Sequence, residues 1–287
     1  MIVSREKVAV LGAGTMGNGI AHVFAQAGYQ VNLIDVNPAA LERAMATIST
    51  NLDRQVNKNL LTAADKTAAL ARLHPLTDLS AGVADRDLVV EAATENRDLK
   101  LAIFRQADAA APAHAILASN TSSISITQIA AATTRSAQVI GMHFMNPVPV
   151  MKLVEVISGY DTSEATRDEI LAISRDLGKT PVPAHDYPGF VANRILMPMI
   201  NEAIYAYWEG VAGAEEIDTI MKLGMAHPMG PLELADFIGL DVCLAILEVL
   251  YQGFGRPHHA PCPLLRNMVT AGHLGRKSGK GFYTYPR

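Results

Sequence analysis

Two polar residues interrupt apolar runs near the middle of the chain, in the stretch GMHFMNPVPVMKLVEVI at 141–157. His143 ends one β-like run, Glu155 lies in the next, and the two are equidistant from Pro149. Because the intervening prolines cannot continue a strand ladder, we expect the chain to fold back there. Residues opposed across a hairpin interact, and a carboxylate beside an imidazole fixes its tautomer. The pattern predicts an acid–base pair; the alternative is a structural role for both residues in the core.

The first third of the chain carries the spacing of a dinucleotide-binding loop. A β-rich run at 7–11 leads into Gly12, Gly14 and Gly17, and a helical stretch at about 15–27 and a second β run at about 30–36 follow. The glycines permit a tight turn, the approach of a pyrophosphate to backbone N–H groups, and close packing of helix and strand. Asp35 ends the second run, where a carboxylate binds a ribose 2′-OH and repels a 2′-phosphate. NAD is therefore favoured over NADP.

Polar side chains also crowd the end of a later apolar strand, in SNTSS at 119–123. One of them could cap the helix expected at about 124–131, because serine and threonine are favoured at that position. One residue suffices for a cap, so the others would be free to face the nucleotide. Ligands of parallel sheets lie beyond the carboxyl ends of the strands, which makes this cluster a candidate binding site.

Strand-like and helical stretches alternate along the first two thirds of the chain, with a helical insertion at about 37–73. This order predicts an α/β fold with a Rossmann-type, mostly parallel sheet. Beyond about residue 188 the patterns are helical, so we expect an all-α C-terminal domain. The predicted domains are a NAD-binding domain at 1–187 and a substrate and dimerisation domain at 188–287. The apolar surface expected on so small a helical domain favours a homodimer.

Composition and charge exclude several classes of protein. Hydrophobic residues make up 49% of the chain, and its net charge of −4 gives no global attraction for nucleic acid. Cys243 and Cys262 form neither a disulfide framework nor a metal-ligand pattern. Neither a signal segment nor an uncharged apolar span of about 20 residues is recognisable. We expect a cytoplasmic enzyme, without a metal and with no membrane or nucleic-acid partner.

Seven stretches of the chain are informative as an ordered set: GAGTMGNGIA, EAATEN, SNTSS, GMHFMNPVPVMKLVEVI, PGFVANRIL, KLGMAHPMGPLELADFIGLD and GRKSGKGFY. Taken together, they resemble the NAD-dependent L-3-hydroxyacyl-CoA dehydrogenase family, in its short 3-hydroxybutyryl-CoA dehydrogenase form. The resemblance covers essentially all 287 residues. It implies the reversible oxidation of an (S)-3-hydroxyacyl-CoA to a 3-ketoacyl-CoA, with NAD as hydride acceptor.

The resemblance also implies roles for individual residues. His143 would be the catalytic base, oriented by Glu155, with Ser122 and Asn193 as partners of the substrate oxygen. The positions that match cofactor contacts of the family are Gly12, Gly14, Thr15, Met16, Gly17, Asp35, Glu95, Lys100, Ser122, Asn146 and Lys277. Asn51 and Lys58, on the helical insertion, match contacts with coenzyme A, although some relatives carry serine at the first of them. Arg54 and Lys66 would add local positive charge for its phosphates.

Two other functions remain open at this point. One is a related two-domain dehydrogenase of a free hydroxy acid or sugar acid, which needs no coenzyme A site. The other is a non-catalytic NAD-binding or structural protein built on the same fold. The sequence also leaves open the acyl chain length, any distal carboxylate, and whether the pathway is β-oxidation, aromatic degradation or butanoate metabolism.

Overall fold

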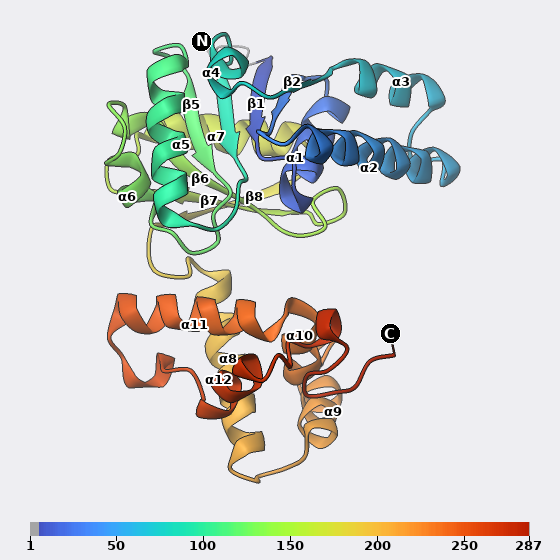
Figure 1. Ribbon diagram of the computed structural model, residues 1–287, viewed down its shortest axis with the longest axis vertical. Helices are drawn as coiled ribbons and strands as arrows, with labels where there is room; N and C mark the ends of the chain where they lie inside the picture. The colour runs from blue at the N-terminus through green and yellow to red at the C-terminus, as the bar shows by residue number, and fades with distance from the viewer. Residues whose placement is uncertain (1–5, 287) are drawn as a thin grey trace. The chain divides into compact units, whose positions relative to one another are not determined.

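The structure is a computed structural model that describes residues 6–286. Residues 1–5 and 287, which the two expected domain ranges include, lie outside the described residues. The described chain divides into two compact units, one ending at Asp186 and the other beginning at Tyr187 (Figure 1).

The first unit is built on an eight-stranded sheet with the order β3-β2-β1-β4-β5-β6-β7-β8. Its strands are β1 (Lys7–Leu11), β2 (Gln30–Ile34), β3 (Leu73–Leu76), β4 (Leu88–Glu91), β5 (Ile116–Ser119), β6 (Val139–Phe144), β7 (Leu153–Ser158) and β8 (Thr180–His185). Strands β6 and β7 are antiparallel, and the other neighbours are parallel. The order of the first six strands is that of dinucleotide-binding sheets, so the Rossmann-type prediction is confirmed.

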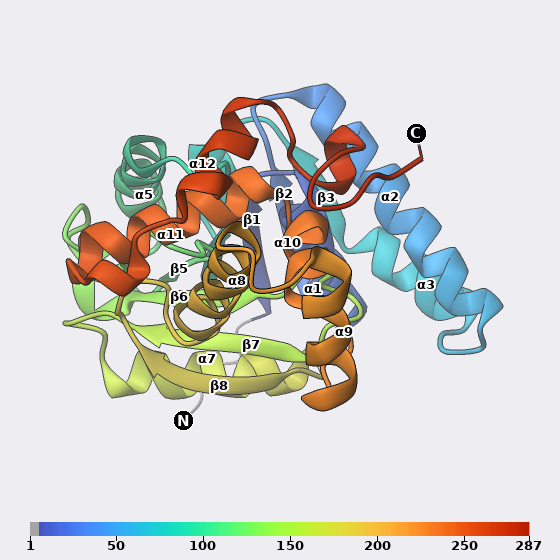
Figure 2. The same cartoon turned by 90° about the horizontal axis from the view of Figure 1, so that it is seen from below.

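Helices cover both faces of this sheet (Figures 1 and 2). They are α1 (Thr15–Gln26), α2 (Pro38–Asn57), α3 (Ala63–Ala71), α4 (Leu79–Val83), α5 (Arg97–Ala110), α6 (Ile126–Ala130) and α7 (Glu164–Asp176). One core joins alternate strand residues such as Val10 and Met142 to Phe24 of α1 and Ile170 of α7. Helices α2 and α3 lie side by side and form the predicted helical insertion (Figure 1).

The short helix α4 was not predicted from the sequence. Asp78 caps it by accepting a hydrogen bond from the N–H of Ala81. Its five residues are too few to show a helical period. Strand β3 begins at Leu73, the residue at which the helical insertion was predicted to end. Strands β4 and β5 end at Glu91 and Ser119, so the polar residues that follow lie on loops.

The second unit is helical, as predicted. It contains α8 (Ala192–Trp208), α9 (Ala214–Gly224), α10 (Pro231–Ile238), α11 (Leu240–Phe254) and α12 (Pro263–Thr270). Its core gathers residues such as Ile200, Leu232 and Leu247. The C-terminal segment is fixed to α10, because Asp236 accepts hydrogen bonds from the backbone N–H groups of Phe282 and Tyr283. No helix in the described part of the chain has the length and apolarity that a membrane span requires.

Candidate active site

The glycine loop between β1 and α1 has the shape of a pyrophosphate cradle. Gly12 has φ +102°, and a Cβ there would lie 2.7 Å from the carbonyl oxygen of Ala92. A Cβ on Gly17 would lie 1.7 Å from the carbonyl oxygen of Gly12, so helix and strand pack too closely for a side chain. A Cβ on Gly14, in contrast, would have no neighbour within 4 Å. No side chain caps the N-terminus of α1, which leaves its N–H groups and this open space suited to a phosphate.

Asp35 lies directly after β2, beside the same loop. One carboxylate oxygen accepts a hydrogen bond from the N–H of Ala13 at 2.8 Å, and the other accepts one from the N–H of Asn37 at 2.9 Å. Thr15 and Met16 form the first turn of α1. The structure thus brings Asp35 together with the glycine loop, as a dinucleotide site requires.

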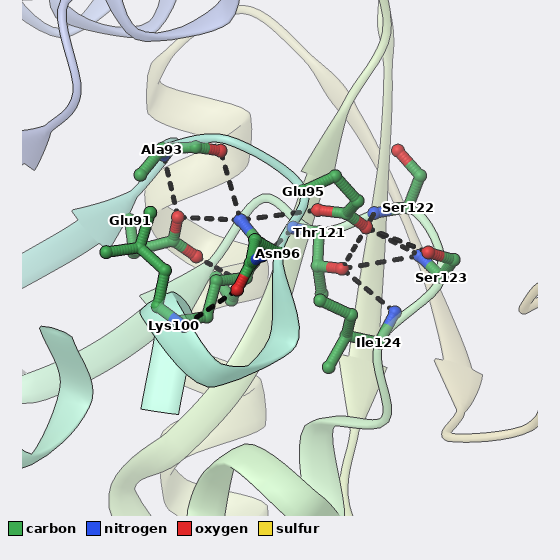
Figure 3. A network of polar contacts seen from close by, with 11 residues as sticks. Glu91, Ala93, Glu95, Asn96, Lys100, Thr121, Ser122, Ser123 and Ile124 are labelled. Atoms are coloured by element: carbon green, nitrogen blue, oxygen red, sulfur yellow. Dashed lines mark hydrogen bonds and ion pairs between the residues drawn. The ribbon is translucent and has the colours of Figure 1, made fainter. Parts of the chain in front are cut away.

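A single carboxylate holds the loop that carries Ser122 (Figure 3). Glu95 accepts hydrogen bonds from the Thr121 hydroxyl at 2.5 Å and from the backbone N–H of Ser122 at 3.0 Å. It also accepts bonds from both the N–H and the hydroxyl of Ser123. Burial alone would raise the pKa of Glu95, but the Lys100 ammonium and these hydrogen bonds hold it below its usual range. Glu95 is therefore ionised at neutral pH and fixes the conformation of the loop.

Lys100 lies beneath this loop and is only 1% exposed (Figure 3). Its ammonium contacts Glu91 at 2.7 Å, Glu95 at 3.3 Å and the carbonyl oxygen of Ala93 at 3.2 Å. Glu91 and the carbonyl oxygen of Ala93 accept hydrogen bonds from the ammonium, and Glu95 is its second ion-pair partner. Glu91 also accepts a hydrogen bond from the Ser119 hydroxyl at 2.7 Å. Lys100 thus holds Glu95 in place, and a direct cofactor contact by this ammonium stays a prediction.

The cap of α6 comes from a residue outside the SNTSS cluster. Ser125 accepts the hydrogen bond from the N–H of Gln128 and is the N-cap residue. Within the cluster, Asn120 instead accepts a hydrogen bond from the N–H of Phe144 at 2.9 Å. This bond ties the end of β5 to the strand that carries His143.

His143 and Glu155 face each other across β6 and β7, which confirms the predicted cross-strand pairing. The distance from His143 Nδ1 to Glu155 Oε2 is 2.8 Å, and the residues are 7% and 3% exposed. When Glu155 is ionised it can only accept a hydrogen bond, which then requires the proton on Nδ1. In the neutral ring Nε2 then holds the lone pair that a general base needs. A substrate hydroxyl is a suitable proton donor to this nitrogen.

The remaining predicted residues lie on three separate elements. Asn146 is exposed on the connection between β6 and β7. Asn193 lies in the first turn of α8. Lys277, in a 3-10 turn (Arg276–Ser278) of the C-terminal segment, pairs with Asp241 at 2.5 Å. The expected contacts of all three with cofactor or substrate stay predictions. No group of three or more metal-ligating side chains occurs within residues 6–286.

Asn51 and Lys58 line a cavity of about 830 Å³ in the first unit. Arg54 lines it too, whereas Lys66 forms an ion pair with Asp53 at 2.6 Å and does not line the cavity. The positive charge that Lys66 was expected to provide for the coenzyme A phosphates is therefore partly neutralised by Asp53. Two further cavity residues, Lys152 and Lys179, were not singled out from the sequence. The only sequence signal was their position directly before β7 and β8.

Comparisons with known proteins match nearly the whole chain to 3-hydroxyacyl-CoA dehydrogenases. Residues 7–187 match the family model "3-hydroxyacyl-CoA dehydrogenase, NAD binding domain", and residues 189–285 match "3-hydroxyacyl-CoA dehydrogenase, C-terminal domain". A probable 3-hydroxybutyryl-CoA dehydrogenase from Bacillus subtilis is 52% identical, covering 98% of this chain and 97% of its own. One from Deinococcus radiodurans is 57% identical, covering 97% and 100%. The crystal structure of an (S)-3-hydroxybutyryl-CoA dehydrogenase from Ralstonia eutropha has a TM-score of 0.96 at 52% identity, covering 99% and 100%.

The buried lysine gives a stability prediction. Lys100→Met leaves Glu91 and Glu95 without their counter-ion, which we expect to lower the free energy of unfolding by about 3–5 kcal/mol. The double variant Glu91→Gln/Lys100→Met removes one of the two unpaired carboxylates, so its free energy of unfolding should fall by less than that of Lys100→Met. Urea denaturation followed by circular dichroism measures the free energy of unfolding of both variants. The control is Lys7→Met, which removes an exposed ion pair with Asp85 and should lower the free energy of unfolding by less than about 1 kcal/mol. A Lys100→Met variant as stable as its control would contradict the role of this ammonium.

Proposed function

The chain belongs to the 3-hydroxyacyl-CoA dehydrogenase family of NAD-dependent oxidoreductases, and we propose that it interconverts (S)-3-hydroxybutyryl-CoA and acetoacetyl-CoA. The observation that carries the proposal is the 2.8 Å contact between His143 Nδ1 and Glu155. The names of the relatives from Bacillus subtilis, Deinococcus radiodurans and Ralstonia eutropha support the four-carbon substrate.

His143 is proposed to move the proton in this reaction. Its Nε2 takes the proton from the 3-hydroxyl group, and the electrons of the broken O–H bond form the carbonyl group as the hydride leaves C3. NAD, when bound, supplies the hydride acceptor. Glu155 holds the ring in the required tautomer and stabilises the imidazolium that forms. In the reverse direction, His143 returns the proton to the ketone oxygen.

Ser122 is proposed to donate a hydrogen bond to the substrate oxygen. Negative charge develops on this oxygen during the reaction, and fixed donors stabilise it without reorganising. The bonds from Glu95 to the backbone of Ser122 and Ser123 support this role, because they hold the loop in one conformation. Asn193 is the second proposed donor, by resemblance to the family alone.

The NAD site is proposed to use the glycine loop and Asp35. The N–H groups at the start of α1 would hold the pyrophosphate, since they have no side-chain cap. Asp35 would accept hydrogen bonds from a ribose, and its negative charge disfavours a 2′-phosphate. The cavity lined by Asn51, Arg54 and Lys58 supports a coenzyme A thioester rather than a free hydroxy acid.

A homodimer through the second unit is proposed as well. This unit exposes large apolar side chains, among them Trp208 (51%), Val211 (73%), Leu223 (82%) and Phe237 (59%). Exposed apolar surface of this kind marks protein interfaces, and most soluble oligomers consist of identical subunits. The expected cytoplasmic location and the pathway stay predictions.

The substrate assignment predicts an order of activities. With NADH in excess, we expect the highest kcat/KM for acetoacetyl-CoA, lower values for longer 3-ketoacyl-CoA substrates, and far lower values for free acetoacetate. The free acid lacks the coenzyme A moiety, whose binding energy contributes to catalysis. A steady-state series at 340 nm measures these values. Equal kcat/KM for acetoacetate and acetoacetyl-CoA would favour the dehydrogenase of a free acid instead.

The catalytic role of His143 predicts the behaviour of His143→Ala. We expect kcat to fall by about 10²–10⁴-fold, because proton transfer by a positioned side chain is lost. NADH affinity, measured by fluorescence titration, should be retained. His114→Ala, which alters a surface histidine paired with Asp87, is the matched control. Turnover of His143→Ala at the rate of the control would remove His143 from the mechanism.

A further inference from the structure

The cavity in the first unit gathers more positive than negative charge. Four cations line it: Arg54, Lys58, Lys152 and Lys179. The ion pairs among residues 6–286 join other side chains, and none includes these four. A cavity lined by charges of one sign raises the local concentration of an oppositely charged ligand. This cavity is therefore suited to a ligand with several negative charges.

Two neighbouring titratable groups leave the charge of the cavity positive. Asp176 is the one carboxylate that lines the cavity, and it contacts Tyr29, whose pKa is raised to about 12 by burial and by this carboxylate. His22 hydrogen-bonds to the cavity residues Gln26 and Gln55. Burial lowers the pKa of His22 to about 4 against the effect of its Gln26 bond, so the ring is uncharged at neutral pH. The cavity keeps an excess of three positive charges over negative ones.

The lysines Lys152 and Lys179 belong to a different part of the fold from Arg54 and Lys58. Arg54 lies in α2 and Lys58 directly follows this helix, whereas Lys152 is the last residue of the connection between β6 and β7. Lys179 is 8% exposed, and its ammonium donates hydrogen bonds to the carbonyl oxygens of Val148 and Met151 within that connection. Lys179 thereby fixes the backbone from which Lys152 extends.

This connection is the one that joins the two strands of the acid–base pair. His143 lies one residue before the end of β6, and Glu155 lies in the first half of β7. The connection is tightly packed, since a Cβ on Gly19 of α1 would lie 2.9 Å from Val148. The carbonyl oxygen of Lys152 accepts a hydrogen bond from the N–H of Thr180 at 2.7 Å. The backbone of Lys152 is therefore held by the sheet, and the residue lines the cavity.

We propose that Lys152 is a phosphate-binding residue that completes this cavity from the β6–β7 connection, facing the same ligand as Arg54 and Lys58. The ligand class is a nucleotide with several phosphate groups, and the source is the 3′-phosphorylated ADP end of the coenzyme A thioester. Lys179 is a positioning residue that acts through the connection. The inference rests on the proposed function, and it adds a second segment to the residues expected from the helical insertion.

A truncated substrate separates this role from a general effect on catalysis. Acetoacetyl-pantetheine carries the same reacting group as acetoacetyl-CoA but lacks the ADP end. For Lys152→Ala we expect KM for acetoacetyl-CoA to rise about tenfold, which corresponds to about 1.4 kcal/mol. KM for acetoacetyl-pantetheine should change less than about twofold, and kcat should be kept with both. Lys152→Glu should raise KM for acetoacetyl-CoA further, because it places a negative charge beside the phosphates.

Two further variants sharpen the test. Lys7→Ala alters an exposed lysine that is paired with Asp85 and does not line the cavity, so its KM for acetoacetyl-CoA should be unchanged. Lys179→Met should lower kcat with both substrates, because the connection to the catalytic strands loses its support.

Three outcomes would contradict these proposals. If Lys152→Ala raised KM equally for both substrates, or changed KM for neither, the assignment of Lys152 would be overturned. A wild-type enzyme with the same KM for both substrates would overturn the cavity as the nucleotide site and leave the dehydrogenase activity standing. Lack of turnover of any 3-ketoacyl thioester would instead refute the proposed function.

Discussion

The site depends on one contact, between the imidazole of His143 and the carboxylate of Glu155. Both side chains are buried, and a buried charge is costly unless it has a hydrogen-bonded partner. The contact exists because β6 and β7 are the antiparallel neighbours in an otherwise parallel sheet, with His143 directly opposite Glu155. A shift of one residue in this register would turn one side chain to the other face of the sheet. The register therefore fixes the partner of the ring and, with it, the nitrogen that the proposed mechanism uses.

A buried group of charges provides the second constraint. Lys100 lies between Glu91 and Glu95, and Glu95 in turn holds the backbone at Ser122. Such groups contribute little to stability when compared with an apolar core, but removing one member leaves an uncompensated charge. These hydrogen bonds fix the backbone of the loop, which the proposed role of Ser122 as a donor to a developing oxyanion requires. The hydrogen bond from the N–H of Phe144 to Asn120 joins the same loop to the strand of His143.

The sequence predicted the features that depend on local spacing. The glycine loop, the Rossmann-type, mostly parallel sheet and the opposition of His143 and Glu155 follow from short patterns with a known geometry. It did not predict that the Lys100 ammonium is buried against groups of the protein itself, because Glu91, Glu95 and Ala93 meet it only after the loop folds. It also missed Lys152 and Lys179, since their shared cavity with Arg54 forms only when α2 and the β6–β7 connection come together in the fold. Tertiary contacts of this kind leave no period in the sequence.

A double-mutant cycle on kcat tests most directly whether Glu155 acts through His143. The four proteins are wild type, His143→Ala, Glu155→Gln and the double variant, all assayed with acetoacetyl-CoA and NADH. If the carboxylate serves only to orient and stabilise the imidazole, Glu155→Gln lowers kcat in the wild type but has almost no effect once His143 is absent. Losses that add in full, so that Glu155→Gln costs as much without His143 as with it, would contradict the pair as one catalytic unit.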